Sequence, residues 1–212
     1  MNNDIKIKVI GAGLAGCEAA WQLAKREIAV DLYEMKSQCK TPAQHLDTLA
    51  ELVCSNSLKS MREDSCQGML KNEMKHFGSI VLEAAYECAV PAGGALAVDR
   101  DKFSAMVTEK IKSHPLIEIE CREVTEIPEG NVIVAAGPLA SDALAEDIKN
   151  LCGGSLSFFD AAAPIVTYES IDHNKTFFKA RYDKGTADYI NCPMNKEQYE
   201  AFYQALITAE TA

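Results

Sequence analysis

Two features of this 212-residue chain could take part in chemistry: a glycine-rich turn near its start, and Cys54, which is set among small polar residues. The turn is Gly11-Ala12-Gly13-Leu14-Ala15-Gly16, a spacing typical of phosphate binding. Gly11 would permit the tight turn, Gly13 would let backbone N–H groups approach a phosphate, and Gly16 would let a helix lie close to a strand. We therefore expect this turn to hold the pyrophosphate of a dinucleotide.

The turn can hold a pyrophosphate only when it lies between a strand and a helix. The sequence before it has the hydrophobic period of a strand, and the sequence after it has that of a helix. Apolar residues alternate with lysines over residues 5–9, and they recur at helical spacing over residues 14–24. A second alternating run, residues 28–33, ends at Glu34, whose carboxylate could accept hydrogen bonds from ribose hydroxyls. The order predicts a βαβ dinucleotide-binding unit. The alternative is a plain glycine-rich turn.

The choice of dinucleotide follows partly from charge. Glu34 would repel the 2′-phosphate of NADP, so FAD and NAD remain as candidates. An apolar strand near residues 132–135 ends in Ala136 and Gly137, which is similar to the second signature of FAD-dependent enzymes with two dinucleotide-binding domains. A generic buried strand and turn would have the same residues. The choice between FAD and NAD stays open at this point.

A loop and a cysteine follow the second expected strand. Residues 35–45 have no period and contain a proline, which predicts an irregular loop beside the cofactor that begins with Met35 and Lys36. Cys54 then precedes three small polar residues that could bind flavin, substrate or backbone. A lone cysteine is most often a small buried residue. A structural and a reactive Cys54 are therefore both considered.

Composition and charge narrow the class of protein. The chain is long enough to bury a sizeable core, and its net charge of −10 argues against a surface that coats nucleic acid. We expect no DNA partner, although a local basic patch could bind RNA. The eight cysteines lie far apart without metal-ligand spacing, and the start of the chain has no signal-peptide pattern, so we expect reduced thiols, no metal and a cytoplasmic protein. No apolar run is long enough to cross a membrane.

The middle of the chain predicts further α/β structure. Helical periods cover residues 68–85, with a break near Gly78 and methionines in the core, and residues 101–113. The glycine pair at 93–94 suggests a backbone that lines the cofactor cleft. Residues 116–121 and 124–128 have the pattern of antiparallel or edge strands that lead to the buried strand.

Beyond the buried strand the sequence predicts a second, mostly antiparallel part. Ser141 could cap a helix through residue 151, and Asn195 could cap a final helix. Between them, runs of β-branched and aromatic residues predict strands at residues 164–169, 176–182 and 187–192. We expect a Rossmann-like domain over residues 1–152 and the start of an antiparallel insertion or substrate domain over residues 153–212.

Together these motifs resemble one family, the folate- and FAD-dependent tRNA (uracil-5-)-methyltransferases. The glycine turn with its following Cys17-Glu18-Ala19-Ala20 is shared with many flavoproteins. Two further matches are Tyr33-Glu34-Met35 and Tyr189-Ile190-Asn191-Cys192-Pro193-Met194. The specific stretches are Cys54-Ser55-Asn56-Ser57 within the match Glu51-Leu52-Val53-Cys54-Ser55-Asn56-Ser57-Leu58, and Pro91-Ala92-Gly93-Gly94-Ala95-Leu96-Ala97-Val98-Asp99-Arg100 within the match that begins at Val90. The resemblance implies an α/β fold with a Rossmann-like FAD-binding domain of the glutathione-reductase-like, two-dinucleotide-binding type.

The resemblance also implies a reductive methylation. In such a reaction FADH2, reduced by NAD(P)H, takes a methylene group from methylenetetrahydrofolate and transfers it to uracil C5 in the tRNA T-loop. Uracil C5 becomes nucleophilic when a base or thiolate adds at C6, so Cys54, the matched family cysteine, would either add covalently or move the C5 proton. A free thiol has a pKa of ~8.5, so attack would need local stabilisation of the thiolate. The residues expected to bind FAD are Gly11, Ala12, Gly13, Leu14, Ala15, Gly16, Glu34, Met35, Lys36, Ala136 and Gly137.

The family is about twice as long as this chain, and its later half supplies another cysteine, much of the folate pocket and the segment that closes the FAD domain. We therefore expect the 212-residue chain alone to bind FAD weakly or not at all and to be inactive. Three alternatives stay open. They are the same chemistry on a ribosomal RNA uridine, a related flavoprotein that modifies the tRNA wobble uridine, and an FAD- or NAD-binding module without chemistry.

Overall fold

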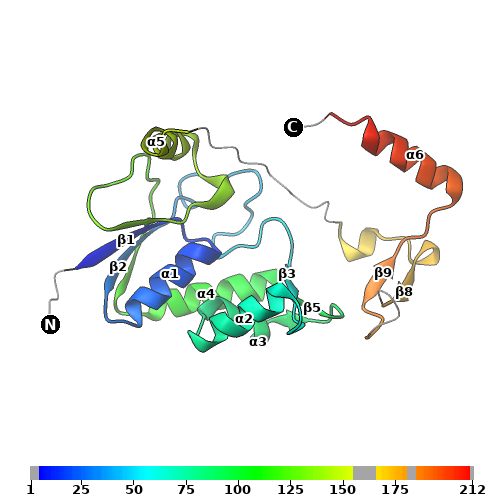
Figure 1. Ribbon diagram of the computed structural model, residues 1–212, viewed down its shortest axis with the longest axis horizontal. Helices are drawn as coiled ribbons and strands as arrows, with labels where there is room; N and C mark the ends of the chain where they lie inside the picture. Colours follow the sequence, from blue (N-terminus) through cyan, green and yellow to red (C-terminus); the bar gives the residue numbers. More distant parts are fainter. Residues whose placement is uncertain (1–4, 155–165, 181–184, 211–212) are drawn as a thin grey trace. The chain divides into compact units, whose positions relative to one another are not determined.

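The computed structural model describes residues 5–154, 166–180 and 185–210 (Figure 1). The chain divides into two units, and each is considered by itself. The first unit comprises Met1–Val90 with Ala95–Ala163, and the second comprises Pro91–Gly94 with Pro164–Ala212.

A four-stranded parallel sheet forms the centre of the first unit. Its strands, in the order β6-β2-β1-β7, are β6 (Ile117–Glu120), β2 (Ala29–Tyr33), β1 (Lys6–Ile10) and β7 (Val132–Val134). Val9, Val30 and Leu32 are completely buried, as expected for parallel strands covered on their faces. Helix α1 (Leu14–Ala24) connects β1 to β2 and packs against both (Figure 1). The predicted βαβ unit is confirmed.

The strand β6 differs in part from the sequence expectation. It is an edge strand, as expected, but it runs parallel to β2, with Val30 opposite Ile117. The reason is that the helix α4 (Arg100–Ser113) precedes it and returns the chain in the direction of β2. Residues 124–128 are not a strand, and the Ile127 N–H donates to the Asp147 carboxylate at 2.7 Å instead of to a sheet neighbour.

Three helices with side-chain N-caps complete the packing around α1. They are α2 (Cys66–His76), α3 (Ile80–Glu87) and α4, capped by Ser65, Ser79 and Asp99 respectively. The prediction that the methionines of the first helical stretch lie in the core was wrong for Met69, which is 57% exposed, whereas Met74 is partly buried. A Cβ on Gly68 would lie 1.8 Å from the carbonyl oxygen of Arg62, so α2 packs through its glycine and turns Met69 outward.

A small antiparallel sheet lies in the same unit, and its first strand begins three residues after Cys54 in the sequence. Its strands, in the order β3-β5-β4, are β3 (Ser57–Ser60), β5 (Ala95–Val98) and β4 (Ala89–Val90). After β7 come a short 3-10 turn, η1 (Gly137–Leu139), and helix α5 (Asp142–Cys152), which Ser141 caps as expected.

The second unit contains an antiparallel hairpin and a helix. The elements are η2 (Tyr168–Ser170), η3 (His173–Lys175), β8 (Phe177–Lys179), β9 (Tyr189–Asn191) and α6 (Lys196–Ile207). Asn195 and Gln198 form a capping box at the start of α6, which confirms that helix. The sequence predicted a strand at residues 164–169. This prediction was wrong for the described residues 166–169, because no strand forms there and η2 begins at Tyr168. Residues 164–165 and 181–182 of the expected strands lie outside the described residues.

Candidate functional site

A cavity of about 250 Å³ opens at the carboxyl ends of β1, β2 and β7. Residues that line it include Ile10 and Tyr33, the last residues of two of these strands. The carboxyl edge of a doubly wound parallel sheet is where such folds bind nucleotides. Ten of the eleven residues expected to contact FAD line this cavity: Gly11, Ala12, Gly13, Leu14, Ala15, Glu34, Met35, Lys36, Ala136 and Gly137.

The three glycines of the turn have different surroundings. Gly11 has a φ of +94°, and a Cβ there would lie 2.6 Å from the Cα of Ala136. Gly16, the eleventh expected residue, lies behind the turn, where a Cβ would meet the Gly11 carbonyl oxygen at 1.7 Å. No described atom lies within 4 Å of a Cβ built on Gly13. The fold itself therefore requires Gly11 and Gly16, whereas the space beside Gly13 is open to a ligand.

The first turn of α1 is suited to an anion. Among the residues that the structure describes, no side chain caps this helix end, and its N-cap residue is Gly13. The first turn contains no acidic residue, while the next amide, that of Cys17, is already bonded to the Gly13 carbonyl oxygen at 3.0 Å. Uncapped N–H groups and the positive end of the helix dipole together favour a phosphate at this place.

Glu34 lies at the end of β2 and is tied to the backbone on both sides. Its Oε2 accepts the N–H of Ala12 at 3.1 Å, and its Oε1 accepts the N–H of Lys36 at 3.0 Å. A carboxylate oxygen has lone pairs for further donors, so Glu34 could still accept ribose hydroxyls. The Lys36 amine, by contrast, is buried in an ion pair with Glu51.

Cys54 is exposed and stands beside Val53, which lines the cavity. The sequence left flavin, substrate and backbone as possible partners of the polar residues 55–57. In the structure, the side chains of Ser55 and Asn56 bond to backbone atoms. Asn56 Nδ2 donates to the carbonyl oxygen of Val98 at 3.2 Å, and the Ser55 hydroxyl accepts the N–H of Ser57 at 3.1 Å. These bonds join the segment after Cys54 to the small antiparallel sheet and leave the thiol on the surface.

The buried thiol of this region is Cys17. Its Sγ donates to the carbonyl oxygen of Ala12 at 3.3 Å, and the residue is completely buried. Burial raises the pKa of Cys17 to about 12, and the nearby Glu34 carboxylate adds to the rise. The following residue, Glu18, accepts from the Ser79 hydroxyl at 2.6 Å and so ties α1 to α3. The motif after the glycine turn is therefore structural.

Sequence reasoning missed part of the cavity wall. Arg122 lines the cavity and lies over the ring of Tyr33, with its Cζ 4.7 Å from the ring centroid. A parallel β6 would have indicated Arg122, because residues after parallel strands gather at one edge of the sheet. Conversely, the part of the lining that the structure describes includes no residue from 90–100, where a backbone lining the cleft was expected.

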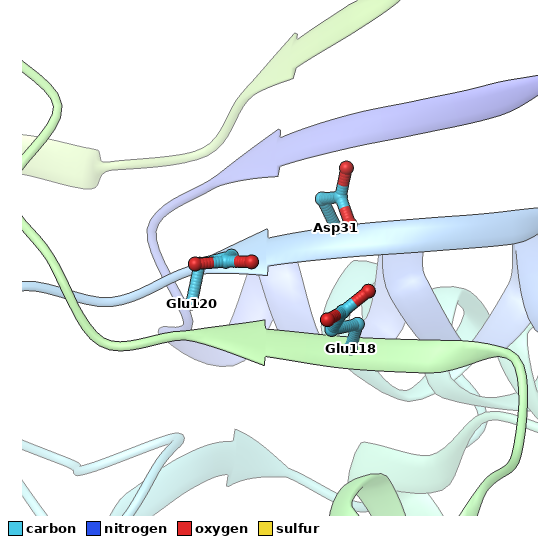
Figure 2. A group of neighbouring side chains, drawn as sticks. All are labelled: Asp31, Glu118 and Glu120. Carbon is cyan, nitrogen blue, oxygen red and sulfur yellow. The ribbon is translucent and has the colours of Figure 1, made fainter.

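An acidic group lies elsewhere on the sheet. Figure 2 shows Asp31 on β2 near Glu118 and Glu120 on β6. Lys6 forms ion pairs with Asp31 and with Glu118, the latter at 2.9 Å, and these carboxylates raise the pKa of the lysine. The protein thus supplies its own cation to this group.

In the described residues, we find no helix with the length and apolar character that a membrane crossing requires.

The parallel sheet order, the glycine turn and the acidic end of β2 define a Rossmann-like, dinucleotide-binding type of fold. The chain belongs to the GIDA family: the family model described as glucose inhibited division protein A matches residues 6–212. The similarity to the methyltransferases noted from the motifs is confirmed by two curated relatives, both called methylenetetrahydrofolate--tRNA-(uracil-5-)-methyltransferase TrmFO.

The relative from Listeria monocytogenes serotype 4b is 57% identical over 207 residues, which cover 97% of this chain and 48% of that protein. The relative from Shouchella clausii is 57% identical over 212 residues, 100% of this chain and 49% of that protein. The chain thus spans about half the length of these curated relatives. Among solved structures, GidA from Aquifex aeolicus is similar with a TM-score of 0.48 and 17% identity over 61% of this chain and 21% of that one.

Proposed function

We propose that this chain is part of a flavoenzyme that methylates C5 of a uridine in the tRNA T-loop. Methylenetetrahydrofolate would be the one-carbon donor, FADH2 the reductant and NAD(P)H the source of its electrons. The names of relatives 57% identical to the chain support the substrate and the donor. The observation that carries the proposal is the cavity at the glycine turn, with open space beside Gly13.

The residues present fit the ADP part of FAD, which contains the adenine, its ribose and the pyrophosphate. The pyrophosphate would lie at the uncapped start of α1 beside Gly13, and the ribose hydroxyls would donate to Glu34. The negative charge of Glu34 would disfavour NADP at the same place. Bound there, the flavin would supply the electrons that convert the transferred methylene group to methyl.

We place Cys54 as the thiol that acts on uracil. As a thiolate it would add to C6, push electron density to C5 for attack on the one-carbon unit, and leave again when the C5 proton is removed. As a base it would instead take the C5 proton. Its exposure and its place next to Val53 on the cavity wall support access to a large RNA substrate.

Two measurements on the full-length protein test the function. We expect a flavin absorbance spectrum in the purified protein, and transfer of a methyl group to unmodified tRNA when methylenetetrahydrofolate is added. A protein without flavin and without transfer would refute the proposal. In cells that lack the gene, mass mapping should show loss of uridine methylation in the T-loop. Loss in ribosomal RNA or at the wobble position would favour those alternatives instead, and no loss would favour a binding module.

The remaining parts of the proposal concern organisation and location. We take residues 1–152 as the first part of the FAD-binding domain and residues 153–212 as the start of the substrate domain. The partners would be tRNA and folate, with neither DNA nor a membrane involved. The place of action would be the cytoplasm, where tRNA and folate occur together.

A further inference from the structure

A buried ion pair lies against the cavity, and one of its two residues, Glu51, has no part in the function proposed so far. Lys36 Nζ lies 3.3 Å from Oε2 of Glu51, and the two side chains are only 3% and 6% exposed. The other oxygen of Glu51, Oε1, accepts the backbone N–H groups of His45 and Leu46 at 2.7 and 3.0 Å. Each oxygen of this carboxylate therefore has a defined partner.

The pair connects two segments of the cavity wall. The N–H of Lys36 donates to Glu34, and the other oxygen of Glu34 accepts the N–H of Ala12 in the glycine turn. Ala50, next to Glu51, donates its own N–H to the carbonyl oxygen of Ala12 at 2.8 Å. The glycine turn, Glu34, Lys36 and Glu51 thus form a closed circuit of contacts around the place proposed for the dinucleotide.

The loop that carries Glu51 is also held from its other side. The Ser104 hydroxyl of α4 donates to the carbonyl oxygen of Leu49 at 2.5 Å, and the N–H of Leu49 donates to the Thr108 hydroxyl at 2.8 Å. The Lys36 amine also bonds the carbonyl oxygen of Thr48. Helix α4 therefore provides a fixed support, and the ion pair with Lys36 joins this support to the cofactor wall.

Cys54 follows Glu51 by three residues, a stretch that spans at most about 10 Å. We propose that Glu51 is a positioning residue, which through Lys36 holds the Cys54 segment in a fixed place relative to the dinucleotide site. This inference rests on the function proposed above. A buried ion pair suits the task because its geometry is well defined and loss of one partner leaves an unpaired charge in the interior.

The test uses Glu51→Gln in the full-length protein. Glutamine keeps an oxygen for the N–H groups of His45 and Leu46 but removes the charge that pairs with Lys36. The matched control is Glu83→Gln, which breaks the exposed pair with Lys110. Three quantities are measured: deuterium uptake of residues 45–54 without ligand, protection of Cys54 from iodoacetamide by FAD, and kcat and KM for tRNA methylation.

We expect Glu51→Gln to speed deuterium uptake in residues 45–54 and to weaken the protection of Cys54 by FAD. We also expect kcat to fall about tenfold or more while KM for tRNA changes less than about threefold, because misplacing a reacting group by an ångström can cost ~10²-fold in rate. Lys36→Met should act alike, and the double variant should lose no further rate, because the two residues act as a unit. The control should match the wild type.

The outcomes separate this inference from the proposed function. Unchanged uptake, protection and kcat in Glu51→Gln would overturn the positioning role while leaving the methyltransferase proposal in place. A fall in kcat no larger than the fall seen in Glu83→Gln would overturn it too. If the wild-type protein neither binds FAD nor methylates tRNA, the proposed function fails, and with it the role of Glu51 in positioning a catalytic thiol.

Discussion

Alanine at Gly16 would test the close approach of α1 to the glycine turn. A Cβ at this position would lie 1.7 Å from the carbonyl oxygen and 2.9 Å from the carbonyl carbon of Gly11. Both are backbone atoms, so the helix has to move away by more than about 1 Å, and such overpacking costs ~1–3 kcal/mol or more. The better helix propensity of alanine offsets up to ~1 kcal/mol of this. We expect the free energy of unfolding to fall by about 2 kcal/mol, roughly a thirtyfold change in the folded-to-unfolded ratio.

Alanine at Gly13 is the matched comparison. The backbone there has φ −72° and ψ −167°, which alanine adopts freely, and no described atom lies within 4 Å of the new Cβ. Alanine is a poorer N-cap than glycine, which lowers the free energy of unfolding. Alanine also reduces the conformational entropy of the unfolded chain, which raises the free energy of unfolding by a similar amount. Stability should therefore stay within about 1 kcal/mol of the wild type. FAD affinity in the full-length protein should nevertheless fall about tenfold or more, because the methyl group takes space proposed for the pyrophosphate.

Urea unfolding followed by circular dichroism measures the first effect, and FAD titration of the full-length protein measures the second. A Gly16→Ala variant as stable as the wild type would refute the close approach. A Gly13→Ala variant that binds FAD as tightly as the wild type would refute the placement of the pyrophosphate. The two substitutions add the same methyl group to the same turn, so the pair separates a packing effect from a ligand effect.

Three further predictions concern a buried thiol, the exposed thiol and a surface cation. The pKa of Cys17 is raised in the folded state, so the unfolded chain loses this proton first, and stability should fall as pH rises from about 9 towards 12; urea midpoints across this range should decline less in Cys17→Ala, and equal declines would contradict the assignment. Cys54→Ala should leave flavin binding in the full-length protein largely intact and remove methyl transfer, so unchanged turnover would exclude the thiol from the reaction. Lys6→Met should leave Asp31 and Glu118 facing each other without their cation. Because Lys6 and Glu118 are exposed, the loss should be below ~1 kcal/mol and should shrink with added salt, and a loss that salt leaves unchanged would argue against a charge effect.

Individual segments show which structural features the hydrophobic periodicity of the sequence predicts correctly and which it does not. The first strand, the turn after it, the first helix and the position of Glu34 directly after the second strand were predicted correctly, because each depends on residues close together in the chain. The direction of β6 was not, because alternation gives the faces of a strand and says nothing of its neighbour. Met69 has a helical spacing like that of core residues, but Gly68 beside it allowed the chain near Arg62 to take the inner face.

The sequence by itself determined the local parts of this protein: a turn that only glycine permits, a helix that starts at it, and an acid at the end of the next strand. The tertiary structure alone decided which distant residues join them. Arg122 reaches the cavity from the segment after β6, Glu51 pairs with Lys36, and Cys17 is buried whereas Cys54 is exposed. Burial and ion pairing depend on what packs against a residue, and those neighbours come from parts of the chain that local patterns do not connect.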